Sequence, residues 1–167
     1  DVMQADGGRG GSIEVRGGKG GLETGGSISL SSGASEAGSS GDVSIASGSS
    51  EGLSGSVQLQ TGAANNGESG SVSIEAGASS LSHGGSVNIH AGSSELSGGG
   101  SISIEGGNSV AQTGGSIILR SGISSATEGG SIELSTGKSL SGSGGEVRIA
   151  TGSSELGDAG SISIASG

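Results

Sequence analysis

The sequence predicts an all-β protein, a parallel β-solenoid (β-helix or β-roll) with about 15 residues per coil and about 11 coils. The main observation is a repeat: Gly, usually Ser, a β-branched residue, any residue and a second aliphatic residue. It recurs at a constant spacing, except that one interval is shorter by a single residue. Apolar residues two positions apart lie on the same face of a strand, and β-branched residues favour extended backbone. Glycine also returns at two fixed phases of each repeat. The pattern leaves the handedness and the cross-section of the solenoid open.

Each predicted strand contributes two aliphatic side chains, which are expected to form a core ladder along the inside of the solenoid. The first ladder position is occupied by Ile13, Ile28, Val43, Val57, Val72, Val87, Ile102, Ile117, Ile132, Val147 and Ile162. The second is occupied by Val15, Leu30, Ile45, Leu59, Ile74, Ile89, Ile104, Leu119, Leu134, Ile149 and Ile164.

Glycine marks both ends of a less regular segment between successive strands. One phase falls three residues after the second ladder position, as at Gly77 and Gly92, and the other opens the next repeat, as at Gly85 and Gly100. Because glycine accepts positive φ without penalty, both phases are expected to be corners of the coil. Leu22, Leu81, Leu96 and Leu156 share one phase of this segment, and we expect them to face the ladder from the opposite side.

The domain prediction is an irregular N-terminal segment over residues 1–11, a candidate cap, followed by one repeat domain over residues 12–167. The last strand, residues 161–164, lies just before Gly167 with no polar capping element after it. An uncovered β-edge invites edge-to-edge association. The sequence therefore favours self-association, end to end or with neighbouring repeats, as part of a longer polymer.

The composition excludes several classes of protein. Gly and Ser make up 82 of 167 residues, there is no Phe, Trp, Tyr, Pro or Cys, and the net charge is −10. An acidic chain without aromatic residues argues against a nucleic-acid partner, and no apolar run is long enough for a membrane span. We expect an extracellular or cell-surface location.

No constellation of residues predicts catalysis, a cofactor or a metal. His83 and His90 are expected at the surface, and Glu75 and Glu105 share a strand phase two repeats apart rather than forming a pair of acids. Calcium-binding β-rolls need an Asp that recurs in each turn, whereas Asp occurs here only at positions 1, 6, 42 and 158. The sequence therefore predicts a protein that is not an enzyme.

Ice binding is the alternative function. The outward strand positions and the residue that opens each strand form hydroxyl pairs in several repeats, namely Ser27, Ser29, Ser71, Ser73, Ser101, Ser103, Ser161 and Ser163. A flat ladder of small hydroxyl side chains is a candidate ice-facing surface. Outward positions also hold Glu14, Gln58, Asn88, Glu133 and Arg148, and these larger side chains would interrupt it.

The repeat unit Gly85-Ser86-Val87-Asn88-Ile89-His90-Ala91-Gly92-Ser93-Ser94 resembles the Gly/Ser-rich repeats of large extracellular proteins of diatoms and related algae. The resemblance covers roughly residues 11–167. In coil length the repeats also resemble β-solenoid ice-binding proteins. The first resemblance implies a structural or adhesive role, as part of a filament or cell-surface fibre that could carry surface glycans, and it implies no catalytic residue.

Overall fold

A computed structural model describes residues 10–166, and over this range the chain is coil, with neither a helix nor a strand. The predicted β-solenoid is therefore wrong, and so is the all-β class. No residue between 10 and 166 is buried, and all of them are exposed except Gly20 and Gly106, which are partly exposed. The predicted cap falls mostly on residues 1–9, which lie outside the described part.

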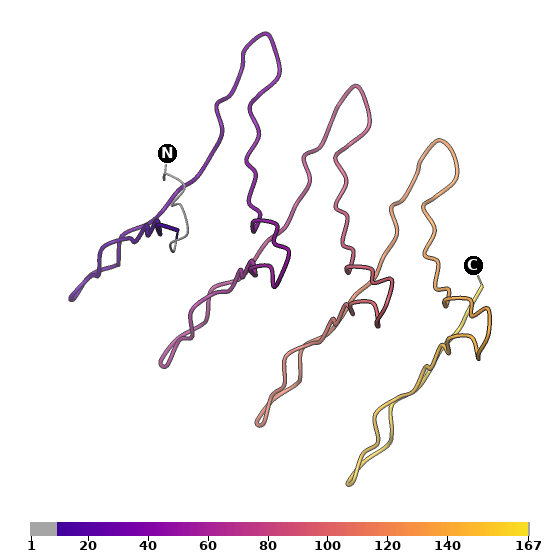
Figure 1. Cartoon of the computed structure of the whole chain (residues 1–167). Coiled ribbons are helices and arrows are strands. Elements are labelled where there is room, and N and C mark those ends of the chain that lie inside the picture. The colour runs from indigo at the N-terminus through magenta and orange to yellow at the C-terminus, as the bar shows by residue number, and fades with distance from the viewer. Residues whose placement is uncertain (1–9, 167) are drawn as a thin grey trace. The chain divides into compact units, whose positions relative to one another are not determined.

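The repeat survives as a local structure, a closed loop that follows each extended segment. We call the loops by their bounding glycines: residues 18–26, 33–41, 48–55, 62–70, 77–85, 92–100, 107–115, 122–130, 137–145 and 152–160. We call the six residues before each loop, and the last six described residues, arms: residues 12–17, 27–32, 42–47, 56–61, 71–76, 86–91, 101–106, 116–121, 131–136, 146–151 and 161–166. Figure 1 shows the loops as hairpin-like excursions of the chain.

The loops are closed by one backbone hydrogen bond between their two bounding glycines. The Gly85 N–H, for example, donates to the Gly77 carbonyl at 2.9 Å, and eight of the ten loops have the equivalent bond at 2.8–3.3 Å. A solenoid instead needs bonds between equivalent strands of successive repeats, which lie almost twice as far apart in the chain. Each doubling of loop length adds about 0.6 kcal/mol to the entropic cost of closing a loop. A bond within one loop therefore costs less entropy than a bond between successive repeats.

These eight bonds are the backbone–backbone hydrogen bonds of the described part of the chain. A folded protein has about one hydrogen bond per residue, and about two-thirds of them join backbone groups. Within residues 10–166 the N–H and C=O groups of the arms therefore have no backbone partner. The arms have the alternating side chains of a strand, but within residues 10–166 no second strand lies beside them.

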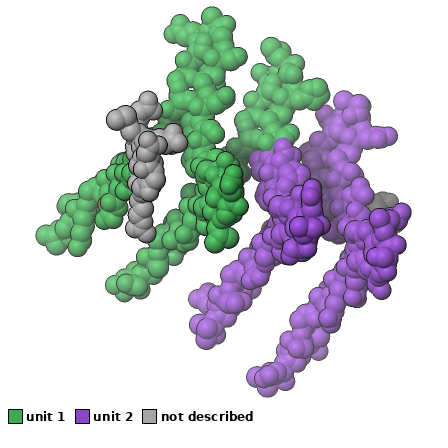
Figure 2. All heavy atoms as spheres, viewed as in Figure 1, with its two compact units in different colours: residues 1–86 green, residues 87–167 purple. Residues whose placement is uncertain are grey.

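The chain divides into two compact units, Asp1–Ser86 and Val87–Gly167 (Figure 2). The described part of each unit contains five loops, and the boundary falls inside the arm 86–91. The first unit holds the one shortened repeat, whose loop 48–55 has eight residues where the others have nine. The missing residue is thus taken from a loop and leaves the arms intact.

Candidate functional site

The repeated loop and the arm before it form the candidate functional site. We call the point where the two bounding glycines of a loop meet its neck, and the neck holds the loop against the end of the arm. At the neck, the second glycine of the loop lies against the last residue of the preceding arm, which is always small: Gly, Ser, Thr or Ala. A Cβ atom on Gly145 would lie 3.0 Å from the Cβ of Thr136, and one on Gly85 would lie 3.1 Å from the Cβ of Ala76. The second glycine phase is therefore set by close approach.

The first glycine phase has a different environment. A Cβ atom added to Gly77, Gly92 or Gly107 would meet no atom within 4 Å, and no described glycine adopts a φ in the left-handed region. The prediction that both phases are corners requiring positive φ is therefore wrong. Only the second phase excludes a side chain, because the two ends of the loop approach each other there.

The tightness of the neck correlates with its hydrogen bond. In the two loops without the bond, 48–55 and 62–70, a Cβ on the second glycine would first meet an atom at 3.6 or 3.7 Å. In the eight bonded loops that distance is 2.9–3.4 Å. The bonded loops are therefore the ones in which the second glycine lies closest to the start of the loop, although the residue types at the neck are the same in the two loops without the bond.

A serine near the start of eight of the ten loops organises the bend of that loop. Its hydroxyl oxygen accepts a hydrogen bond from a backbone N–H two or three residues later, as from Ser97 to Ser94 at 3.0 Å. Serines that accept in this way are Ser35, Ser50, Ser79, Ser94, Ser109, Ser124, Ser139 and Ser154. The two remaining loops have Gly20 and Ala64 at this position. Short serine side chains bind nearby backbone in turns, so this phase has a structural role.

The serine phase was missed at the sequence level although the signal was present. A serine stands two residues after the first glycine of the loop in eight of the ten repeats. In a chain with 41 serines, the repeat pattern gave this phase no more weight than the serine that opens each strand. The structure separates the two, because within residues 10–166 the loop serines accept hydrogen bonds from backbone N–H groups and the strand-opening serines do not.

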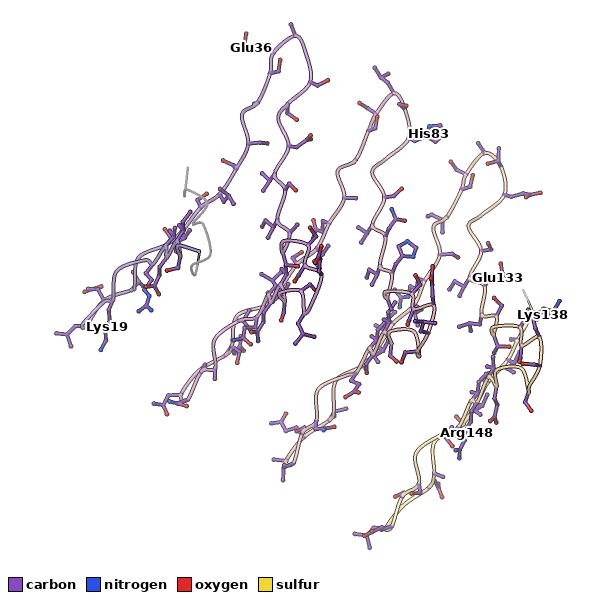
Figure 3. The ribbon with its side chains drawn as sticks, in the orientation of Figure 1. Lys19, Glu36, His83, Glu133, Lys138 and Arg148 are labelled. Carbon is purple, nitrogen blue, oxygen red and sulfur yellow. The ribbon has the colours of Figure 1, made fainter. Side chains whose placement is uncertain are left out.

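Aliphatic residues at the bends are fully exposed. Leu22, Leu81, Leu96 and Leu156 have 98–104% of their surface accessible, so the prediction that they face the ladder is wrong. In Figure 3, Lys19, Glu36 and His83 are labelled on loops, with their side chains projecting from the trace. The apolar and charged side chains of the loops are therefore exposed to solvent.

The ladder residues lie on the arms and are graded in exposure by phase. From Ile28 onward the first ladder position is 49–61% exposed and the second 65–78%, except for Ile164 at 90%. Within residues 10–166 they form no buried core. The prediction that these residues line the inside of a solenoid is therefore wrong. Their exposure still depends on which of the two ladder positions they occupy.

The opposite face of the arms is mostly polar, with Ile118 as an exception, and in four arms its side chains pair within the arm. Ser73 donates to Glu75 (3.0 Å), Ser103 donates to Glu105 (2.9 Å), and Gln58 donates to Gln60 (2.7 Å). The Arg16 guanidinium forms an exposed ion pair with Glu14. Each pair joins residues i and i+2, as expected on one face of an extended backbone.

These pairs bear on two sequence hypotheses. Glu75 and Glu105 each accept from a serine of their own arm, so the same local arrangement occurs twice. Ser73 and Ser103, from the candidate ice-facing set, direct their hydroxyl groups toward these carboxylates. All eight serines of that set are exposed, and they lie on separate coil arms rather than on a sheet.

Over residues 10–166 there is no pocket and no group of three or more His, Asp or Glu side chains that could hold a metal ion. The same residues include no helix that could cross a membrane. In comparisons with known proteins, no family model, curated protein or solved structure matches this chain.

Proposed function

We propose that this chain is an extracellular structural or adhesive repeat protein that forms a segment of a filament or cell-surface fibre. One observation carries the proposal: the chain presents the same loop and arm ten times over, with every described residue accessible. Linked copies of a weak binding element gain affinity because each contact raises the effective concentration of the next. The repetition therefore suits a protein that holds other surfaces or chains through many weak contacts.

Charge and composition support a hydrated setting. A net charge of −10 favours a soluble polymer. Self-association, end to end or between neighbouring repeats, is part of the proposal, and the many exposed serines offer sites for surface glycans. The proposed role involves no catalysis, and the acids Glu75 and Glu105 serve to bind serines within their arms.

The test is to locate the protein and image it in its native material. Immunogold labelling of intact, unpermeabilised cells of the source organism should decorate surface fibres or secreted material. Negative-stain images of extracted material should show elongated assemblies. Labelling confined to the cell interior, or native material consisting only of short, uniform monomers, would overturn the proposal.

The ice-binding alternative is tested separately. It requires measurable thermal hysteresis or inhibition of ice recrystallisation at micromolar protein. The described geometry does not favour it, because the hydroxyl groups of Ser73 and Ser103 are bound to Glu75 and Glu105 and the arms form no flat ladder. Unchanged ice growth would eliminate this alternative.

A further inference from the structure

The chain presents a large unpartnered surface, to which both the arms and the loops contribute. The accessible surface of the chain is 16,966 Å², whereas a compact protein of 15.3 kDa is expected to expose about 7,100 Å². The difference of about 9,800 Å² is several times the roughly 1,600 Å² that a standard protein–protein interface buries in total. The chain therefore has far more surface to bury than one specific contact requires.

Two properties of this surface point to strand pairing. The arms alternate apolar and polar residues, and the first ladder position is β-branched in all eleven of them. Within the described residues, the arm backbones also lack backbone partners. An extended segment with free N–H and C=O groups and one apolar face is a template for pairing with another chain.

Charge distinguishes the arms from the loops. The loops contain eight acidic residues, Glu23, Glu36, Glu51, Glu68, Glu95, Glu128, Glu155 and Asp158, against Lys19 and Lys138. The arms contain six, Glu14, Asp42, Glu75, Glu105, Glu133 and Glu146, against Arg16, Arg120 and Arg148. No arm exceeds one unit of net charge, and six of the eleven have none. The net charge is therefore −6 over the loops and −3 over the arms, so electrostatic repulsion between identical chains is weaker at the arms than at the loops.

We infer that the partner of the arms is a second copy of this chain, paired arm to arm along its side, with the charged loops left in solvent. The inference rests on the proposed structural function and specifies its contact surface as lateral. Because both copies carry their arms at the same spacing, one matched pair brings the neighbouring arms into register, and the weak contacts become multivalent. The same loops that carry most of the net charge keep the chain dispersed at low ionic strength.

The test uses the purified full chain in sedimentation velocity and far-UV circular dichroism, from micromolar to millimolar protein, at about 20 mM and about 500 mM NaCl. The expected result is a concentration-dependent association that is promoted by salt and accompanied by a β-sheet signal. Association without a β-sheet signal, or a chain that remains monomeric throughout, would overturn the inference. A monomeric chain would also count against self-association in the proposed function, whereas the extracellular location and the fibre are tested separately by labelling and imaging of native material.

Two matched variants identify the surface. The arm variant carries Val72→Ser, Val87→Ser, Ile102→Ser and Ile117→Ser, and the loop variant carries Leu81→Ser, Leu96→Ser, Leu140→Ser and Leu156→Ser. Both remove four aliphatic side chains and leave the charge unchanged. We expect the arm variant to raise the protein concentration needed for association about tenfold or more, and the loop variant to change it less than about twofold. An equal or larger effect of the loop variant would overturn the inference.

A third measurement shows that the arm variant keeps its loops. Hydrogen exchange of the Gly100 amide, which donates to Gly92 at 2.9 Å, should be the same in the arm variant and the parent. This readout separates loss of the contact surface from loss of the repeat structure.

Discussion

The neck of the loop provides the sharpest prediction, because its two glycines differ in surroundings while sharing one hydrogen bond. In the loop 107–115, the Gly115 N–H donates to the Gly107 carbonyl at 2.8 Å. A Cβ atom on Gly115 would lie 2.9 Å from the backbone nitrogen of Gly107, whereas one on Gly107 would meet nothing within 4 Å. Gly115→Ala should therefore open this neck, and Gly107→Ala should leave it closed.

The expected size of the effect follows from the two energies involved. An intramolecular hydrogen bond contributes about 1 kcal/mol net, which favours the closed neck about fivefold. Overpacking by one methyl group against the backbone costs about 1–3 kcal/mol, so a central value of about 2 kcal/mol reverses the preference. Replacing Gly107 costs nothing at the neck and restricts the open chain, which favours closure by about 0.4–1 kcal/mol.

The assay is hydrogen exchange of the amide of residue 115, measured by NMR at low salt and low protein concentration and referenced to the unprotected rate of the residue present. The parent should show about sixfold protection and Gly115→Ala almost none. Gly107→Ala should retain at least the parental protection. The reasoning would be refuted if Gly115→Ala kept the parental value, or if both variants lost protection alike.

Three further results are expected from the same measurement. Ser94→Ala should remove the protection of the Ser97 amide, because it deletes the acceptor 3.0 Å away, and an unchanged Ser97 rate would contradict this role. Ala64→Ser should create protection at the Gly67 amide, since a serine at this phase binds the N–H three residues on in the other loops; continued free exchange would count against it. Deleting Ser82 should expose the Gly85 amide, because the eight-residue loop 48–55 makes no neck bond within the described chain, and retained protection would show that loop length is not the cause.

Several features of the structure could be predicted from the sequence alone. The period, the two glycine phases and the placement of the missing residue in the loop 48–55 all follow from counting. The paired aliphatic phases also persist, since Val72 and Ile117 are among the least exposed apolar residues and Leu81 and Leu96 are among the most exposed. These are properties of a single repeat, and a single repeat contains the information that determines them.

The partner of each arm could not be predicted in the same way. Alternation at Val87 and Ile89 is equally compatible with pairing to the next repeat, pairing to another chain, or no pairing, because the pattern specifies a face and not its occupant. Pairing with the next repeat was predicted, and this prediction was wrong. Positive φ was also wrongly expected at Gly85 and Gly100, where the lack of a side chain instead lets the two ends of the loop approach each other.

Contacts between labelled residues test most directly whether the repeat closes on itself or stacks on its neighbour. We expect nuclear Overhauser contacts between Gly77 and Gly85, the two ends of one loop, since these residues share the neck hydrogen bond. We expect none between Val87 and Ile102, which occupy the same phase of successive repeats and would be adjacent in a solenoid. Contacts between successive repeats in the dilute monomer, together with an absence of those across the neck, would contradict both expectations.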